Sequence, residues 1–222
     1  MDAPTFGGSN PVVLRSGASL SCGAAMGREQ WLALSHAGST QRLVLPYPHA
    51  GLGGQELVVS PDERYAVLFV YSGQSEQGYE LLELSPTLRH LRSVPYREGK
   101  GDAPMFSPDG RWLAMLVTTT PMVRGTDQYA EDAFDPAGEG DVLVDWAELL
   151  VQAVPDGTPR VTAIGTVLPR SFDHDTFADW RLHGALGFAG DDRVTLRLPW
   201  SSDARLEVAL PAAEVITTSA PA

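Results

Sequence analysis

The sequence contains very little lysine, a single cysteine and no long apolar run, and each absence excludes a class of protein. Lys100 stands alone beside fifteen arginines, and the net charge is −12. This balance argues against general nucleic-acid binding, because phosphate contacts need clustered basic side chains. Cys22 alone cannot form an intrachain disulfide. The longest apolar run, residues 65–71, is much shorter than the roughly 20 residues that cross a bilayer, so we expect no membrane partner.

The beginning of the chain also lacks a recognisable secretion signal. Residues 1–25 contain no basic region followed by an apolar region, which a signal peptide requires. We therefore expect a cytoplasmic protein. A periplasmic or secreted chain whose signal had been trimmed would have the same sequence, so that alternative stays open.

Common catalytic and cofactor motifs are absent as well. The sequence has no nucleophile elbow, P-loop or H-E-x-x-H motif, and the glycines at 51, 53 and 54 do not complete a dinucleotide loop. The five histidines do not pair at metal-ligand spacing, and we interpret His36, His49 and His90 as loop or surface residues. Cys22, among small residues, is interpreted as a packing residue. The sequence thus predicts no cofactor, no metal site and no catalytic set.

The sequence is rich in turn-forming residues, with 22 glycines and 17 prolines. Its clearest unit is residues 101–117, which reads as strand, tight turn and strand. The turn is Ser107-Pro108-Asp109-Gly110, in which proline presets φ, aspartate bonds nearby backbone and glycine accepts a positive φ. Residues 111–117 are mostly apolar, as in a buried strand.

This unit recurs along the chain. Residues 60–64 (SPDER) match residues 107–111 (SPDGR) 47 positions later, and residues 188–193 echo residues 106–111. We count about four units, near 11–50, 51–101, 102–169 and 170–217, within a single domain spanning 1–222. A spacing of about 50 residues falls in the range of four-stranded propeller blades.

The Ser-Pro-Asp-Gly/Glu-Arg turn between two apolar strands resembles the TolB-type, WD-repeat-like β-propeller repeat. The resemblance implies an all-β fold: a small β-propeller of about four blades, or an incomplete propeller. A twisted β-sandwich is the alternative. The family resemblance says almost nothing about function, because propellers serve both as binding modules and as companion domains of peptidases.

Two long loops are expected, at residues 118–140 and 169–183. We expect a strand over residues 141–154, with a helix as the alternative, because short apolar runs are ambiguous. If a ring closes, residues 11–15 would complete the last blade beside residues 205–217. Chain direction reverses at each turn of an antiparallel meander, so both long loops should emerge opposite the Ser-Pro-Asp turns.

Acidic side chains gather in the first long loop. Residues 125–159 contain nine acids and no lysine or arginine. The simplest interpretation is a solvated acidic loop; a basic protein partner comes next. A divalent metal comes last, because the spacing does not match an EF-hand loop. The candidate binding residues in this loop are Asp127, Glu131, Asp132, Asp135 and Glu139.

The second long loop combines carboxylates with imidazoles. Its candidate binding residues are Asp173, His174, Asp175, Asp179 and His183. Such clusters can support acid–base or metal chemistry, although a structured connecting loop is simpler. We therefore predict a non-enzymatic binding module that engages a protein partner through an acidic loop face, whose charge favours a basic partner. The alternative is a hydrolase or lyase with an Asp/His site on the same loops. The oligomeric state is not predicted.

The repeated turns predict a far-UV circular dichroism spectrum dominated by strand. Helix should be far below the content of about a third that is average for globular proteins. A spectrum with helix above that average would contradict the propeller interpretation.

Overall fold

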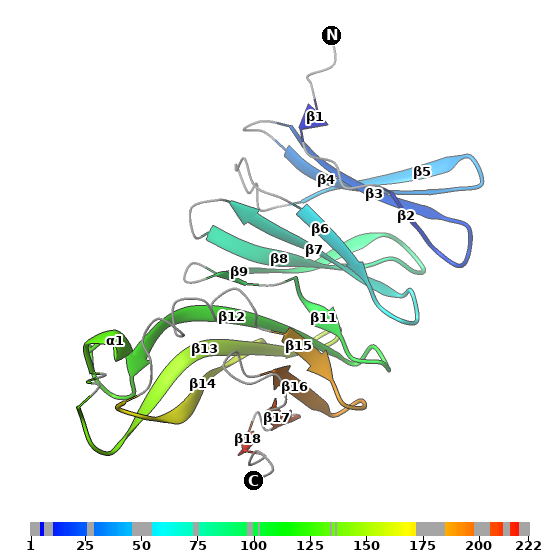
Figure 1. The fold of residues 1–222 in the computed structure, drawn as a ribbon. Coiled ribbons are helices and arrows are strands. Elements are labelled where there is room, and N and C mark those ends of the chain that lie inside the picture. The colour runs from blue at the N-terminus through cyan, green and yellow to red at the C-terminus, as the bar shows by residue number, and fades with distance from the viewer. Residues whose placement is uncertain are drawn as a thin grey trace. The chain divides into compact units, whose positions relative to one another are not determined.

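The structure is a computed structural model that describes residues 5–6, 11–25, 29–45, 55–72, 76–96, 100–101, 103–133, 135, 137–171, 185–197, 205–210 and 214–217 (Figure 1). Strands dominate this part of the chain, and its one helix is the four-residue α1 (Ala130–Ala133). The all-β prediction is therefore confirmed. The alternation of buried and exposed side chains along residues 141–146 is that of a strand, so the helix alternative there is wrong.

The strands form four antiparallel sheets that follow one another along the chain. The first contains β1 (Thr5–Phe6), β2 (Val12–Val13), β3 (Ser19–Ala25), β4 (Glu29–His36) and β5 (Ser39–Val44). The second contains β6 (Gln55–Val59), β7 (Tyr65–Ser72), β8 (Glu76–Glu83) and β9 (Arg89–Tyr96). The third contains β10 (Lys100–Gly101), β11 (Met105–Phe106), β12 (Trp112–Val123), β13 (Asp141–Ala153) and β14 (Arg160–Pro169). The fourth contains β15 (Ala185–Phe188), β16 (Arg193–Arg197), β17 (Arg205–Ala209) and β18 (Glu214–Thr217).

Each sheet is a meander in which consecutive strands pair, the arrangement that builds a propeller blade. In the first and third sheets the opening strand is split, so that β1 and β2 both pair with β3, and β10 and β11 both pair with β12. The expected place of residues 11–15 beside residues 205–217 is not observed. β2 pairs with β3, and the fourth sheet has four strands of its own.

The hairpin of β12 and β13 is longer than the sequence suggested. Residues 118–123, expected in a loop, continue β12. The register shifts between Thr118 and Met122, and again between Asp145 and Ala147. Such irregularities accommodate a proline, here Pro121, that would otherwise argue against a strand. The connection between the two strands therefore begins only after Val123 and contains α1.

The chain forms two compact units, and each has its own apolar core. The first unit is Met1–Glu98 with Asp109–Arg111 and Val154–Gly157; the second is Gly99–Pro108, Trp112–Ala153 and Thr158–Ala222. In the first unit, Leu20 and Leu32 of the first sheet pack with Leu68 and Leu82 of the second, and the buried Cys22 is a member of the same core, as expected. In the second unit the core is shared by the third and fourth sheets and contains the largest fully buried side chain, Trp146.

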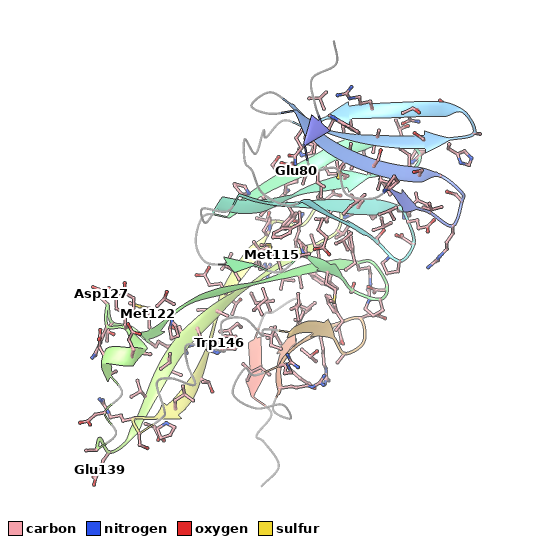
Figure 2. The ribbon with its side chains drawn as sticks, turned by 45° about the horizontal axis from the view of Figure 1, so that its top comes forward. Glu80, Met115, Met122, Asp127, Glu139 and Trp146 are labelled. Atoms are coloured by element: carbon pink, nitrogen blue, oxygen red, sulfur yellow. The ribbon has the colours of Figure 1, made fainter. Side chains whose placement is uncertain are left out.

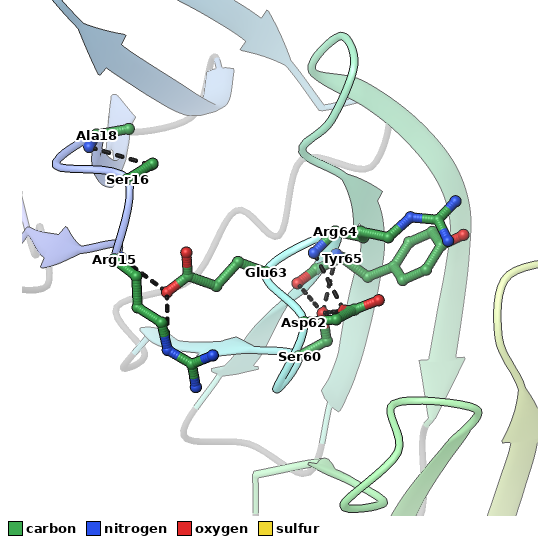
Figure 3. A network of polar contacts seen from close by, with 8 residues as sticks. All are labelled: Arg15, Ser16, Ala18, Ser60, Asp62, Glu63, Arg64 and Tyr65. Carbon is green, nitrogen blue, oxygen red and sulfur yellow. Dashed lines mark hydrogen bonds and ion pairs between the residues drawn. The ribbon is translucent and has the colours of Figure 1, made fainter.

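In the second and third sheets, the turn between the first two strands is fixed by side chains as well as by backbone. In the second sheet, Ser60 Oγ donates to Asp62 Oδ1 at 2.6 Å and accepts from Tyr65 N at 3.0 Å (Figure 3). Asp62 Oδ1 also accepts from Arg64 N, and Glu63 has a φ of +59°. The corresponding Gly110 of the third sheet has a φ of +73°. The aspartates are thus turn formers, as predicted.

The first and third turns of a meander lie at the same end of the sheet. Leu84 N donates to Arg64 O at 2.7 Å, which joins the two turns of the second sheet. Equivalent bonds run from Val154 N to Arg111 O and from Leu210 N to Asp192 O, both 2.8 Å. The connection between β12 and β13 therefore leaves the other end of its sheet, as expected. Most of residues 169–183 lie outside the described residues, so their placement stays a prediction.

Replacing Gly110 should show what the left-handed backbone contributes to stability. Gly110→Val should lower the free energy of unfolding by about 1–3 kcal/mol, because a β-branched residue resists positive φ. Crowding is not the cause, since an added Cβ would lie 3.6 Å from the nearest atom, Asp62 Oδ1. Gly110→Asn is the matched control, because asparagine tolerates this region and should lose less. Equal urea midpoints for the two variants would contradict this explanation.

Candidate functional site

The five acidic candidates of the first loop all lie in the connection between β12 and β13, and all are exposed. We call this set the acidic segment (Asp127, Glu131, Asp132, Asp135 and Glu139). Figure 2 places Asp127 and Glu139 at the end of the hairpin, with Trp146 farther along β13. No basic residue occurs within residues 125–141, so the segment itself is negatively charged; Arg124 precedes it in the chain, and Arg170 contacts its backbone.

The acidic segment is held in place by a small number of contacts. Ala130 and Ala133 of α1 are buried, whereas Glu131 and Asp132 between them are exposed. Asp135 N donates to Arg170 O at 3.1 Å, and Asp135 Oδ1 accepts from Ala137 N at 2.9 Å. Backbone contacts therefore hold the described part of the segment, and among the described residues its carboxylates do not gather as a set of metal ligands.

The hairpin also contains an ion pair at the base of the acidic segment. Arg124 donates to Asp145 Oδ1 from both Nε, at 2.7 Å, and Nη2. This hydrogen bonding raises the pKa of the Arg124 guanidinium. The pair crosses β14 at Gly165, where an added Cβ would meet Arg124 Nη2, Asp145 Oδ1 and the Val144 carbonyl. A side chain at position 165 would collide with these atoms, so glycine is required there. Asp145 also neutralises Arg124, the cation nearest to the acidic segment in the chain.

The five candidates of the second loop, Asp173, His174, Asp175, Asp179 and His183, lie outside the described residues, so their role stays a prediction. Among the residues that the structure does describe, no three His, Cys, Asp or Glu side chains gather as metal ligands. Within the same residues, no helix has the length and apolar character needed to cross a membrane.

A buried polar cluster, which the sequence did not reveal, lies on the second sheet. Glu80 of β8 is fully buried, and its Oε2 contacts His90 Nε2 at 2.8 Å and accepts from Ser93 Oγ at 2.6 Å. Ser93 Oγ and His90 Nε2 are 3.2 Å apart. The expectation that His90 is a loop or surface residue is wrong: it lies on β9, and its side chain is only 21% exposed.

The cluster does not have the geometry of a catalytic triad. In a triad, one imidazole nitrogen takes the serine proton while the other is oriented by the carboxylate. Here the same nitrogen, His90 Nε2, faces both Ser93 and Glu80. Burial raises the pKa of Glu80, opposed by its hydrogen bonds to Ser93 and His90. The arrangement is that of a buried structural network.

The cluster could have been sought in the sequence of residues 78–84. Glu80 interrupts an apolar strand between Tyr79 and Leu81, both of which are buried. A carboxylate in that position needs partners, because an unpaired buried charge is unfavourable. The partners come from the next strand, where Ser93 is directly opposite Glu80. That register cannot be derived from residue types alone, since β8 and β9 also contain an irregularity between Leu81 and Leu82.

No protein-family model matches this chain, and no curated protein matches it. Solved structures that resemble it include hydrazine synthase from Kuenenia stuttgartiensis, with 9% identity over 89% of this chain and 51% of that one and a TM-score of 0.48. Acylaminoacyl peptidase from Pyrococcus horikoshii has 9% identity over 98% of this chain and 33% of that one, with a TM-score of 0.47. The β-propeller domain of Cps50 (Swd1) from Myceliophteria thermophila has 12% identity over 73% and 62%, with a TM-score of 0.31.

This chain spans about half the length of the hydrazine synthase chain and a third of the peptidase chain. With identities of 9–12% and TM-scores of 0.48 or less, the activities of those proteins do not transfer to it.

Substituting Glu80 should change how stability depends on pH. Glu80→Gln keeps an acceptor oxygen but removes the titrating carboxyl group. A carboxyl whose pKa is raised by folding binds its proton more tightly in the native state. The free energy of unfolding of the wild type should therefore fall, relative to Glu80→Gln, as pH rises from 4.5 toward the raised pKa. Below 4.5 the difference should level off.

Urea unfolding followed by tryptophan fluorescence across this pH range measures the difference. Ser93→Ala is the companion variant, since it removes a hydrogen bond that lowers the pKa of Glu80 and should extend the window to higher pH. Parallel stability curves for the wild type and Glu80→Gln would show that Glu80 titrates as it does in the unfolded chain.

Proposed function

We propose that this chain is a non-enzymatic binding module that engages a basic protein partner through the acidic segment. The observation that carries the proposal is the position of these carboxylates at the end of the β12–β13 hairpin, exposed and without a basic residue among them. Like charges gathered on an ordered surface favour encounter with a partner of opposite charge. The proposal includes the second loop, with Asp173, His174, Asp175, Asp179 and His183, as part of the same binding face.

Two features support a binding role over hydrolase or lyase chemistry. The cluster that contains a histidine, a serine and a carboxylate is buried in the second sheet, and its geometry is not catalytic. The acidic segment, in contrast, is supported by the buried Ala130 and Ala133 beneath exposed carboxylates. Ordered connections on a rigid sheet scaffold are the usual location of binding residues.

The proposal extends to the family and the compartment. The matching turns at Ser60 and Ser107 support placing the chain among TolB-type, WD-repeat-like propellers, because serine and aspartate serve the same backbone groups in both. Codon-related composition, with one lysine, one asparagine and two isoleucines, supports a bacterial source with a GC-rich genome. A cytoplasmic location is the accompanying proposal.

Neutralising part of the acidic segment should weaken partner binding without unfolding the chain. The test variant combines Asp127→Asn, Asp132→Asn and Glu139→Gln. It keeps Asp135, because the Asp135 carboxylate accepts a hydrogen bond from Ala137 N. The matched control combines Asp156→Asn, Asp191→Asn and Asp192→Asn, which are exposed elsewhere and remove the same charge. Proteins captured from a lysate of the native organism are quantified by mass spectrometry at about 50 mM and about 300 mM salt.

We expect the test variant to lose the salt-sensitive partner several-fold, because direct charge pairs and steering are removed together. The control variant should retain that partner. Equal retention by both variants, with unchanged melting temperatures, would exclude the acidic segment as the binding surface.

A further inference from the structure

The last strand of the third sheet, β14 (Arg160–Pro169), presents a long edge whose central residues are uncharged. In the part of the chain that the structure describes, β14 pairs only with β13. Its residues 161–168 (VTAIGTVL) contain neither charge nor proline. An edge of this length and composition is a ready template for another strand, and proteins ordinarily protect such edges.

The corresponding strands of the first two sheets are protected in the usual ways. β9 contains Arg89, Arg92 and Pro95, and proline cannot donate to an added strand. β5 is short and polar, with Arg42 among its six residues. β14 carries arginine and proline only at its two ends, Arg160 and Pro169, so the stretch between them lacks the protection seen in β9 and β5.

The outward face of this strand offers apolar contacts. Val161 and Val167 are 53% and 57% exposed, and Ala163 between them is exposed as well. Gly165 belongs to the same row, and the Arg124–Asp145 ion pair lies over it, so the apolar row is interrupted at that position. Leu143 of β13, directly opposite Val167, is 37% exposed. A strand added beside β14 would place alternate side chains against this row, while the inward Ile164 and Leu168 remain in the core.

The acidic segment lies at the C-terminal end of β14. Asp135 N donates to Arg170 O, and Arg170 N donates to Gly140 O at 2.9 Å. Arg170 Nη1 reaches the Ala133 carbonyl at 3.5 Å. The residue that follows the strand, Arg170, is thus bonded to the backbone of the acidic segment, which places that segment at the C-terminal end of β14.

We propose that β14 accepts an added strand from a protein partner: an extended segment with alternating β-branched residues and a cluster of Lys or Arg at the end that reaches the acidic segment. Main-chain hydrogen bonds would supply affinity, and the apolar and charged contacts would select the sequence. The inference rests on the proposed function and deepens it. A second copy of this chain is the less favourable occupant, because each copy carries a net charge of −12 and the same acidic residues.

Two fluorescent peptides of about nine residues test the proposal, and each has alternating Thr and Val. One carries Lys-Arg-Lys at its N-terminus, which suits antiparallel addition; the other carries it at its C-terminus, which suits parallel addition. We expect one of them to bind the full chain, measured by anisotropy. Hydrogen exchange at the amides of residues 161–168 should slow in its presence.

The test variant is Val161→Lys with Val167→Lys, which places charge on the edge at two exposed positions. The matched control is Val13→Lys with Val44→Lys, two valines that are 72% and 50% exposed on the first sheet. Both variants change net charge equally, so a general electrostatic effect would appear in both. We expect the β14 variant to weaken peptide binding by at least about tenfold and the control to leave it nearly unchanged.

Three results would overturn the inference. If the peptide binds but only the acidic-segment variant weakens it, without slowed exchange in β14, the proposed function stands and the strand-addition site does not. If neither peptide binds, the edge site is excluded, and lysate capture decides the proposed function separately. If light scattering finds a dimer that Val161→Lys with Val167→Lys dissociates, the edge is occupied by a second copy.

Discussion

The register of the paired strands depends on the tight turn that begins each meander. A residue with positive φ, Glu63 in the second sheet and Gly110 in the third, reverses the chain within a few residues. The backbone bond from Ser60 N to Tyr65 O then closes the turn, and Ser107 N to Trp112 O does the same in the third sheet. A slip of one residue would exchange the two faces of the strand, so the apolar core of each unit depends on this local geometry.

The apolar cores restrict where charged side chains can lie. Each sheet buries alternate apolar positions, which leaves few places where a carboxylate can remain ionised without a partner. Glu80 is buried and bonded to His90 and Ser93, so its charge depends on the pairing of β8 with β9. The carboxylates of the acidic segment occupy the exposed end of a hairpin instead. The two groups have the same chemistry and opposite environments: Glu80 is buried in a polar network, whereas the acidic segment is exposed to solvent.

The third sheet combines three features that the other sheets do not combine within the described residues. It has the longest hairpin, an acidic connection that contains α1, and a final strand without charge or proline between residues 161 and 168. Arg170 connects these features, because its backbone bonds to both Asp135 and Gly140. Gly165 adds a further constraint, since the Arg124–Asp145 pair crosses the strand there. Both the proposed binding segment and the proposed strand-addition edge belong to this sheet.

The sequence by itself determined the all-β class, the four meanders and the position of the Ser-Pro-Asp turns. These depend on local chemistry: proline presets φ, aspartate bonds the backbone two residues on, and glycine accepts the left-handed region. It also located the acidic segment, because a stretch without basic residues is visible in one dimension. Residues 118–123 were missed because Pro121 and three threonines resemble a loop, and only the pairing of Thr118, Met122 and Val123 with β13 shows a strand.

Tertiary structure decided the features that require two distant segments. Glu80 and His90 meet because β8 and β9 pair in a register that includes an irregularity, and residue types do not specify that irregularity. The place of β2 beside β3, in the first sheet and not the last, was decided in the same way. One backbone hydrogen bond, from Asp135 N to Arg170 O, joins residues 35 positions apart and places Asp135 beside the end of β14. Local propensity fixes turns and strand character, but which strands become neighbours is a property of the folded chain.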